Sequence, residues 1–266
     1  MHLLIFGLGY TTARLAARLR DEGWRVTATR RRGDGDVLAF DDDAGVASAI
    51  ASATHILSSV PPVDDADPVL VRYGALLATA PARWVGYLSS TGVYGDAGGA
   101  WVDEASPVGR GRRSARVAAD LAWQALRDDV RVFRLPGIYG PGRSAIDRVR
   151  AGTAQRIDAP GHRFSRIHVD DIGTCVAASF DRGGPGVFNV ADAEPAPGAT
   201  VIEYACDLLG LPYPPLEALS VAALSPMARG FYAESRQVAA AKIGRELGVT
   251  LAYPEFRSGL RACLAG

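Results

Sequence analysis

The sequence contains almost no lysine. Of its 29 lysines and arginines, only Lys242 is a lysine. Arginine keeps its charge at any working pH, so these arginines are excluded as titrating general bases. The formal net charge is zero. Bulk electrostatics therefore does not favour nucleic acid or an acidic membrane surface, and we predict that neither is a partner.

Cysteine is also scarce. Cys175, Cys206 and Cys263 are scattered without a CxxC spacing, and the four histidines do not form a zinc-ligand pattern. We therefore predict buried thiols, no disulfide framework and no metal site. No apolar run approaches the roughly 18 residues of a membrane span. The first residues also lack a basic segment and a small-residue cleavage site, so we expect a cytoplasmic protein.

What is present begins with a glycine turn. An apolar run, Leu3 to Phe6, leads into Gly7 and Gly9, and Thr12 stands where a third glycine is usual. A buried strand, tight turn and helix in this order aim backbone N–H groups at a phosphate. The alternative is an ordinary strand-to-helix turn without a ligand. The predicted cofactor-binding residues of this turn are Gly7, Leu8, Gly9, Tyr10 and Thr11.

Strand and helix patterns then alternate along the chain. This alternation predicts a parallel sheet with right-handed crossovers and ligands outside the carboxyl ends of its strands. We expect strands at 25–29, 37–40, 55–60, 83–88, 130–135 and 187–190, and helices at about 11–22, 44–51, 67–79, 112–127 and 170–180.

The end of the second strand carries an arginine cluster, Arg30 to Arg32, where NAD-binding sites usually carry an acid. A cationic cluster here suits a 2′-phosphate, so we predict NADP in preference to NAD. The alternative is a solvated basic loop, with Asp34 or Asp36 supporting NAD. Asp41, after the third strand, is predicted to face an adenine edge.

Six arginines fall between residues 143 and 166. One interpretation is that they line an anionic pocket. The other is that they are solvated and partly balanced by Asp147 and Asp158, and the sequence does not decide between the two. These arginines are Arg143, Arg148, Arg150, Arg156, Arg163 and Arg166.

Several stretches resemble the extended short-chain dehydrogenases/reductases, the NAD-dependent epimerase/dehydratase group: GLGYTTA, LSSTGVYGD, FRLPGIYGPGR and RIHVDDI. The resemblance implies an α/β fold, a Rossmann-type doubly wound parallel sheet with a small C-terminal substrate lobe. It implies a Rossmann domain over 1–141 and about 166–193, and a lobe over about 142–165 and 194–266. Further cofactor-binding residues that it implies are Ser58, Ser59, Val60, Pro136, Gly137 and Ile138.

The resemblance also maps the catalytic positions. The family's serine or threonine, which hydrogen-bonds the reacting oxygen, corresponds to Ser90. The family's tyrosine and lysine correspond to Arg112 and Arg116, and no tyrosine lies between Tyr94 and Tyr139. Arg116 is predicted to hold the nicotinamide ribose, and Arg112 to bind an anion or stabilise an oxyanion. Neither suits general acid–base work near neutral pH.

If a proton moves, Tyr94, Tyr139 or His168 is a candidate to move it. Each also suits a structural role, and for His168 we favour the role of holding a turn before a helix.

The sequence leaves two candidate functions. The first is an NADP-dependent oxidoreductase or epimerase/dehydratase-like enzyme on a small, anionic or sugar-like substrate. The alternative is a non-catalytic NADP-binding sensor or regulator. The resemblance also allows a monomer or a homodimer formed through the helices at 67–79 and 112–127.

Overall fold

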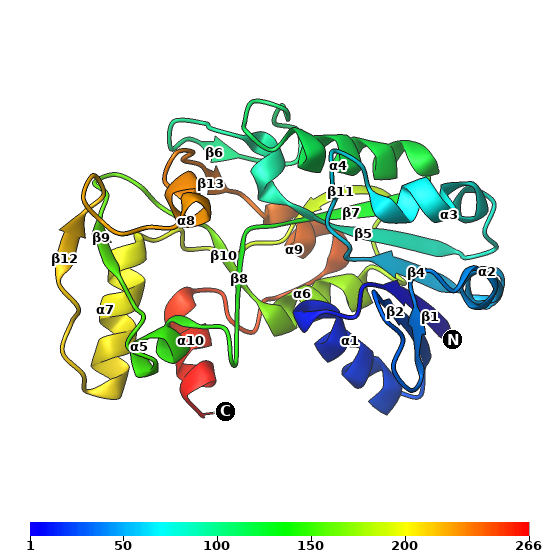
Figure 1. Cartoon of the computed structure of the whole chain (residues 1–266), viewed down its shortest axis with the longest axis horizontal. Helices are drawn as coiled ribbons and strands as arrows, with labels where there is room; N and C mark the ends of the chain where they lie inside the picture. Colours follow the sequence, from blue (N-terminus) through cyan, green and yellow to red (C-terminus); the bar gives the residue numbers. More distant parts are fainter. Residues whose placement is uncertain (266) are drawn as a thin grey trace.

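The computed structural model describes residues 1–265. Its centre is a parallel seven-stranded sheet in the order β11-β7-β5-β4-β1-β2-β3 (Figure 1). The Rossmann-type α/β fold predicted from the sequence is confirmed. The strands are β1 (His2–Phe6), β2 (Arg25–Arg30), β3 (Val37–Ala39), β4 (His55–Ser58), β5 (Trp84–Ser90), β7 (Val130–Leu135) and β11 (Gly186–Asn189).

The central strand β1 is buried along its whole length. Its alternate side chains enter different cores: Leu3 and Ile5 pack on one face of the sheet, and Leu4 and Phe6 on the other. Strand order reverses beside β1, which pairs with both β2 and β4. Such a reversal opens a crevice at the carboxyl ends of the strands, and the glycine turn lies there.

Helices cover both faces of the sheet, as continuous apolar strands require. Leu15, Ile172 and Ile243 bring α1, α6 and α9 onto one face, and Val46 and Trp123 belong to the opposite core. The helices are α1 (Tyr10–Asp21), α6 (Val169–Ala178) and α9 (Ala241–Leu247) on one face, and α2 (Asp43–Ser52), α3 (Pro68–Ala78) and α4 (Ser114–Leu126) on the other.

A second core forms the lobe at the left of Figure 1. Ile146, Ile202, Phe256 and Leu260 pack together within it. Its elements are α5 (Ala145–Arg150), β9 (Arg156–Asp158), α7 (Gly198–Leu209), β12 (Leu216–Ala218) and α10 (Phe256–Ala265). The α9 residues of the predicted lobe range instead pack with the sheet core, because the chain returns to α6 and β11 there. The two-domain division itself stays a prediction.

Two short parallel pairings lie outside the seven-stranded sheet and the lobe core. They are β8 (Gly137–Tyr139) with β10 (Arg166–His168), and β6 (Trp101–Val102) with β13 (Gln237–Val238). A 3-10 turn, η1 (Thr91–Tyr94), follows β5, and α8 (Pro226–Phe231) precedes β13. No helix within residues 1–265 combines the length and the apolar character needed to cross a membrane.

Candidate cofactor and substrate site

The glycine turn is held by side-chain hydroxyls. Gly7 has a φ of +86°, and a Cβ there would approach the Ser59 Oγ to 3.0 Å. The Thr12 hydroxyl donates to the Gly7 carbonyl oxygen at 2.7 Å and accepts from the Gly9 N–H at 3.0 Å. Ser59 also donates to the Gly7 carbonyl oxygen, at 2.7 Å. Thr12, at the place of the third glycine, therefore closes the turn through its side chain.

Gly9 differs from Gly7. It precedes α1 in an extended conformation, is exposed, and no heavy atom lies within 4 Å of where its Cβ would be. It lines a cavity of about 310 Å³. Open space above a helix N-terminus fits a phosphate of a dinucleotide, so the residues present fit the cofactor that the fold implies.

This first cavity brings together many of the predicted cofactor residues. Ser90, at the end of β5, lines it together with Arg116 of α4. The other predicted residues that line it are Gly9, Tyr10, Thr11, Ser59, Pro136 and Ile138, whereas Gly137 lines the neighbouring cavity. The predicted cofactor-binding residues that line neither cavity are Gly7, Leu8, Arg30, Arg31, Asp41, Ser58 and Val60.

The predicted adenine end of the site lies at the exposed ends of β2 and β3. Arg30 donates from Nε to the Leu8 carbonyl oxygen at 3.2 Å, which ties the end of β2 to the glycine turn. Arg31, Arg32 and Asp41 are exposed. The assignment of these residues to the cofactor stays a prediction.

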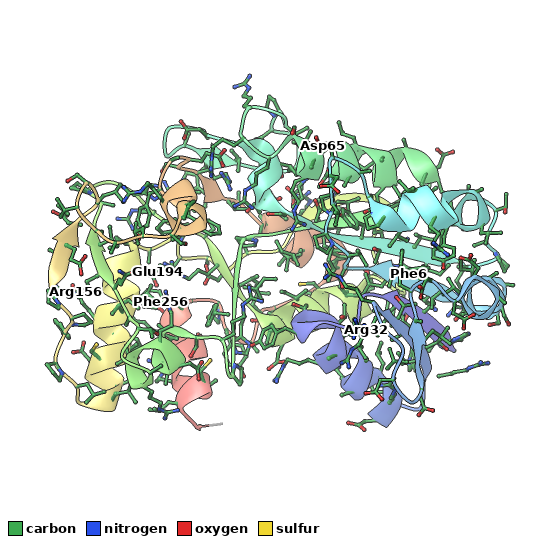
Figure 2. All side chains as sticks on the ribbon, viewed as in Figure 1. Phe6, Arg32, Asp65, Arg156, Glu194 and Phe256 are labelled. Atoms are coloured by element: carbon green, nitrogen blue, oxygen red, sulfur yellow. The ribbon has the colours of Figure 1, made fainter. Side chains whose placement is uncertain are left out.

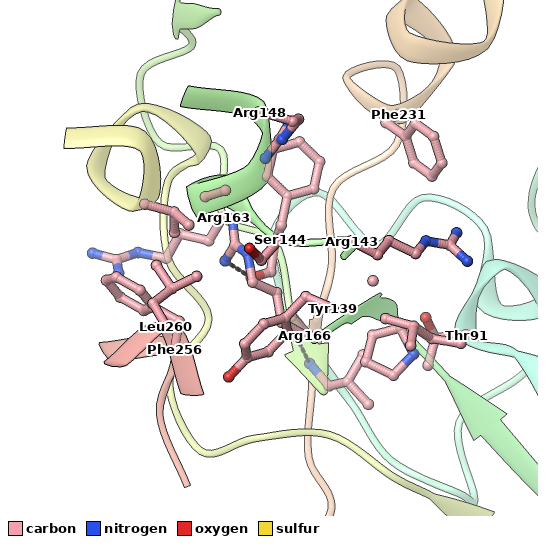
Figure 3. A pocket seen from close by; sticks show the side chains of 18 of the residues that line it. Thr91, Tyr139, Arg143, Ser144, Arg148, Arg163, Arg166, Phe231, Phe256 and Leu260 are labelled. Carbon is pink, nitrogen blue, oxygen red and sulfur yellow. Dashed lines mark hydrogen bonds between the residues drawn. The ribbon is translucent and has the colours of Figure 1, made fainter. Parts of the chain in front are cut away.

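A second cavity, of about 810 Å³, lies beside the first (Figure 3). Ser90, Pro136, Ile138 and Arg143 line both cavities, so the two meet at the ends of β5 and β7. The second cavity extends to α5 and α10 of the lobe, through residues such as Leu260. Two binding regions that share Ser90 can bring a cofactor and a second molecule together.

Arginine dominates the charge of the second cavity. Its six arginines face two acids, Asp147 and Glu234. The Asp147 carboxylate accepts hydrogen bonds from Ser144, and Glu234 accepts one from the Arg112 N–H. The excess of positive charge suits an anionic ligand. The six are Arg113, Arg143, Arg148, Arg163, Arg166 and Arg236, so four of the six arginines between 143 and 166 line it and Arg150 and Arg156 do not.

Burial makes several of these charges costly. Desolvation lowers the pKa of Arg166 to about 10. It also lowers the pKa of Arg113 and of Arg236, although Glu234 opposes the shift at both. Figure 3 shows Arg143 extended toward the side of Thr91 and Phe231. An anion entering the cavity would offset this accumulated charge.

The structure corrects the predicted position of Arg112. Helix α4 begins at Ser114, so Arg112 lies before it and lines neither cavity. Its guanidinium donates to the Gly230 carbonyl oxygen and lies 3.5 Å from Glu234 Oε1. The neighbouring residue, Arg113, enters the cavity instead. The family resemblance aligned Arg112 with the catalytic tyrosine, so the predicted site did not include Arg113.

The two candidate tyrosines point away from the shared edge. Tyr94 is buried, and its hydroxyl donates to Asn189 Oδ1 at 2.7 Å and accepts from Arg134 at 3.1 Å. Tyr139 lines the second cavity, but its hydroxyl lies on the side of Phe256 and away from Thr91 (Figure 3). A Cβ on Gly259 of α10 would lie 2.1 Å from that hydroxyl oxygen. Burial raises the pKa of both phenols.

His168 has a structural position. It is buried at the N-terminus of α6, where its Nδ1 accepts from the Asp170 N–H at 3.3 Å. Burial lowers its pKa, which keeps this nitrogen available as an acceptor. The prediction of a residue that holds the turn before a helix is confirmed.

Two further cavity residues lacked a usable sequence signal. Phe231, at the end of α8, and Arg236, before β13, lie far along the chain from Ser90. Only the return of the segment after α8 to the sheet brings them to the cavity. Figure 2 shows α8, in faint orange, above the helices of the lobe, and β13 after it pairs with β6.

We compared the chain with protein-family models, with curated proteins and with solved structures. A scan against protein-family models finds no match. The chain is 31% identical over 229 residues to Protein YeeZ of Escherichia coli K12, covering 72% of this chain and 78% of that protein. A structure of a functionally unknown conserved protein from Silicibacter pomeroyi is 44% identical, with a TM-score of 0.93 and coverage of 99% and 98%.

A more distant structure shows the same fold. The human epimerase family protein SDR39U1 with NADPH is 19% identical, with a TM-score of 0.79 over 99% of each chain. This likeness extends over the sheet and the lobe together. It shows that the two proteins share a fold.

Proposed function

Because this chain belongs to the family of Protein YeeZ and has the fold of the extended short-chain dehydrogenases/reductases, we propose that it is a nicotinamide-dinucleotide-dependent enzyme acting on a small anionic substrate. One observation carries the proposal. Ser90 lines both the cavity that begins at Gly9 and the cavity that the six arginines line. Cofactor and substrate would therefore meet at this residue.

The cofactor would be held by the glycine turn, with Gly9 under a phosphate and Arg116 beside the ribose. Bound there, a nicotinamide dinucleotide supplies a hydride donor or acceptor. We propose NADP in preference to NAD because Arg30 ends β2 and Arg31 and Arg32 follow it. Two similar solved structures contain different cofactors, NADPH in SDR39U1 and NAD in MoeE5.

Ser90 would orient the substrate. Its Oγ accepts a hydrogen bond from the Gly92 N–H at 3.1 Å, which leaves the hydroxyl hydrogen free to be donated to a substrate oxygen. The arginines would neutralise the anionic part of the substrate. The chain's own residues thus bind and orient the substrate, while Tyr94 and Tyr139 keep structural roles.

The second candidate function is a non-catalytic NADP-binding sensor. It is favoured by the replacement of the tyrosine–lysine pair by arginines and by the hydroxyl directions of Tyr94 and Tyr139. The retained Ser90 and the large arginine-lined cavity favour the enzyme, because a sensor of cofactor alone has no need of them.

Titration with NADPH and NADH, followed by nicotinamide fluorescence, tests the cofactor. We expect NADPH to bind more tightly. Binding of neither below about millimolar concentration, a free energy near −4 kcal/mol, would overturn the proposal. Turnover of a panel of anionic carbonyl and hydroxyl compounds then separates enzyme from sensor. A Ser90→Ala variant that keeps full turnover would remove Ser90 from the mechanism.

A further inference from the structure

Arg113 lies beside the hydroxyl of Ser90. Both the Arg113 Nη1 and the Ser90 Oγ lie 3.2 Å from the position that a Cβ on Gly92 would take. The two atoms are therefore no further apart than twice that distance. Only a glycine at position 92 leaves room between them, since a Cβ would also approach the Arg113 Cδ to 2.8 Å. Both residues line the second cavity.

The guanidinium of Arg113 is held but not neutralised. Its Cζ lies 5.2 Å from the centre of the Phe231 ring at the end of α8, a cation–π contact. Within residues 1–265 no carboxylate forms an ion pair with it. Glu234, the nearby acid, is engaged by the Arg112 N–H and by Arg236.

The surroundings make an uncompensated cation at this point unfavourable. Arg236, Arg116 and Arg112 all act on Arg113 with like charge, and burial removes part of its hydration. A neutral carbonyl oxygen would relieve little of this cost, whereas a permanent anion would offset it directly. Ser90 adds a second donor, because its Oγ already accepts from the Gly92 N–H.

We propose that Ser90 and Arg113 together bind an anionic oxygen group of the substrate, a carboxylate or a phosphate, at the end of the cavity next to the cofactor crevice. This inference rests on the proposed function for the role of Ser90. It makes the substrate an acid whose charged group adjoins its reacting end. Arg148 and Arg166, which also line the cavity, remain for a second anionic group.

Calorimetric titration of small anions tests the site without turnover. The probes are oxamate as the carboxylate and inorganic phosphate, each titrated with and without saturating NADPH. We expect one of them to bind, and its affinity to fall about tenfold or more in Arg113→Gln. The probe that binds more tightly identifies the group. Arg110→Gln, an exposed arginine outside both cavities, should bind as the unchanged protein does.

Two further variants keep the test decisive. Arg113→Lys retains charge but loses the planar fork, and should bind the anion with intermediate affinity. Thermal unfolding of each variant checks that the fold persists. The inference is overturned if the anion affinity falls in Arg148→Gln but stays the same in Arg113→Gln and Arg113→Lys. That result would assign the anion to the part of the cavity near Arg148. Absence of any anion binding up to about 50 mM also overturns it.

The inference and the proposed function fail in different ways. If NADPH does not bind but the anion affinity still depends on Arg113, the proposed function is wrong and the anion site stands. If NADPH binds and the anion affinity is the same in Arg113→Gln as in the unchanged protein, the anion site is wrong and the cofactor assignment stands.

Discussion

Asp120 of α4 and Arg134 of β7 form a buried ion pair with two hydrogen bonds, Nη2 to Oδ1 at 2.7 Å and Nε to Oδ2 at 3.1 Å. Their side chains are 0% and 4% exposed. Ser89 also donates to Asp120, and Arg134 donates to the Tyr94 hydroxyl. The ion pair thus fixes α4 against β7, and the hydrogen bond from Ser89 ties the same carboxylate to β5, the strand that carries Ser90.

Asp120→Asn should destabilise the fold strongly. It leaves the buried Arg134 guanidinium without its charge partner, which typically costs roughly 3–5 kcal/mol. Urea unfolding measures the loss. Glu22→Gln, which breaks the exposed Arg18–Glu22 pair, is the control and should cost no more than about 1 kcal/mol. Equal losses in the two variants would contradict the structural role given to Asp120.

Tyr94→Phe separates a structural from a catalytic role. The variant leaves Asn189 and Arg134 each short of one buried hydrogen bond, so we expect a loss of about 1–3 kcal/mol in unfolding free energy. NADPH affinity and turnover of an identified substrate should change little. A loss of turnover by several hundredfold with normal stability would instead make Tyr94 a catalytic residue.

Gly9 and Gly7 should respond differently to substitution. Gly9→Val places a side chain in open space beside the phosphate position, so the fold should persist while NADPH affinity falls about tenfold or more. Gly7→Ala forces a side chain into a positive-φ conformation against Ser59, and should cost about 1–2 kcal/mol or more in stability. Fluorescence titration and thermal unfolding measure the two effects. Unimpaired NADPH binding by Gly9→Val would place the phosphate elsewhere.

The arginines after β2 should set cofactor preference. In the double variant Arg31→Ser, Arg32→Ser, NADPH affinity should fall about tenfold because the 2′-phosphate loses charge-assisted hydrogen bonds. NADH affinity should stay the same, since NADH carries no such phosphate. Arg110→Ser controls for the loss of surface charge. An equal change for both cofactors would show that these arginines do not read the 2′-phosphate.

The lowered pKa of His55 should make the fold less stable in acid. Burial among Trp24, Trp84 and Phe180 lowers its pKa from 6.5 to about 4. As pH falls from 6.5 toward 4, the unfolded chain takes up a proton that the folded protein does not. The free energy of unfolding therefore decreases by up to roughly 3 kcal/mol as the pH falls from 6.5 to 4.

His55→Phe keeps an aromatic ring at this site and removes the titration. Urea unfolding between pH 4 and pH 7 should therefore show a shallower acid-side decrease in the variant than in the unchanged protein. Parallel profiles for the two proteins would show that His55 does not control this range.

The sequence alone determined the order and type of the sheet elements. Strand β1 reads as buried because Leu3 to Phe6 are continuously apolar, and the turn after it is set by local backbone needs at Gly7. Alternation of strand and helix then leaves few possible arrangements, since crossovers are right-handed. The apolar run, the glycine turn and the alternation of strands and helices depend on neighbouring residues and not on distant contacts. They can therefore be recognised in the sequence.

Only the tertiary structure decided which arginine reaches Ser90. Arg112, before the start of α4, contacts Glu234, whereas Arg113 lies beside Gly92. The tertiary structure also determines the direction of the Tyr139 hydroxyl, and it brings Phe231 to the cavity from far along the chain. These facts depend on packing between segments distant in sequence, for which residue spacing contains no signal.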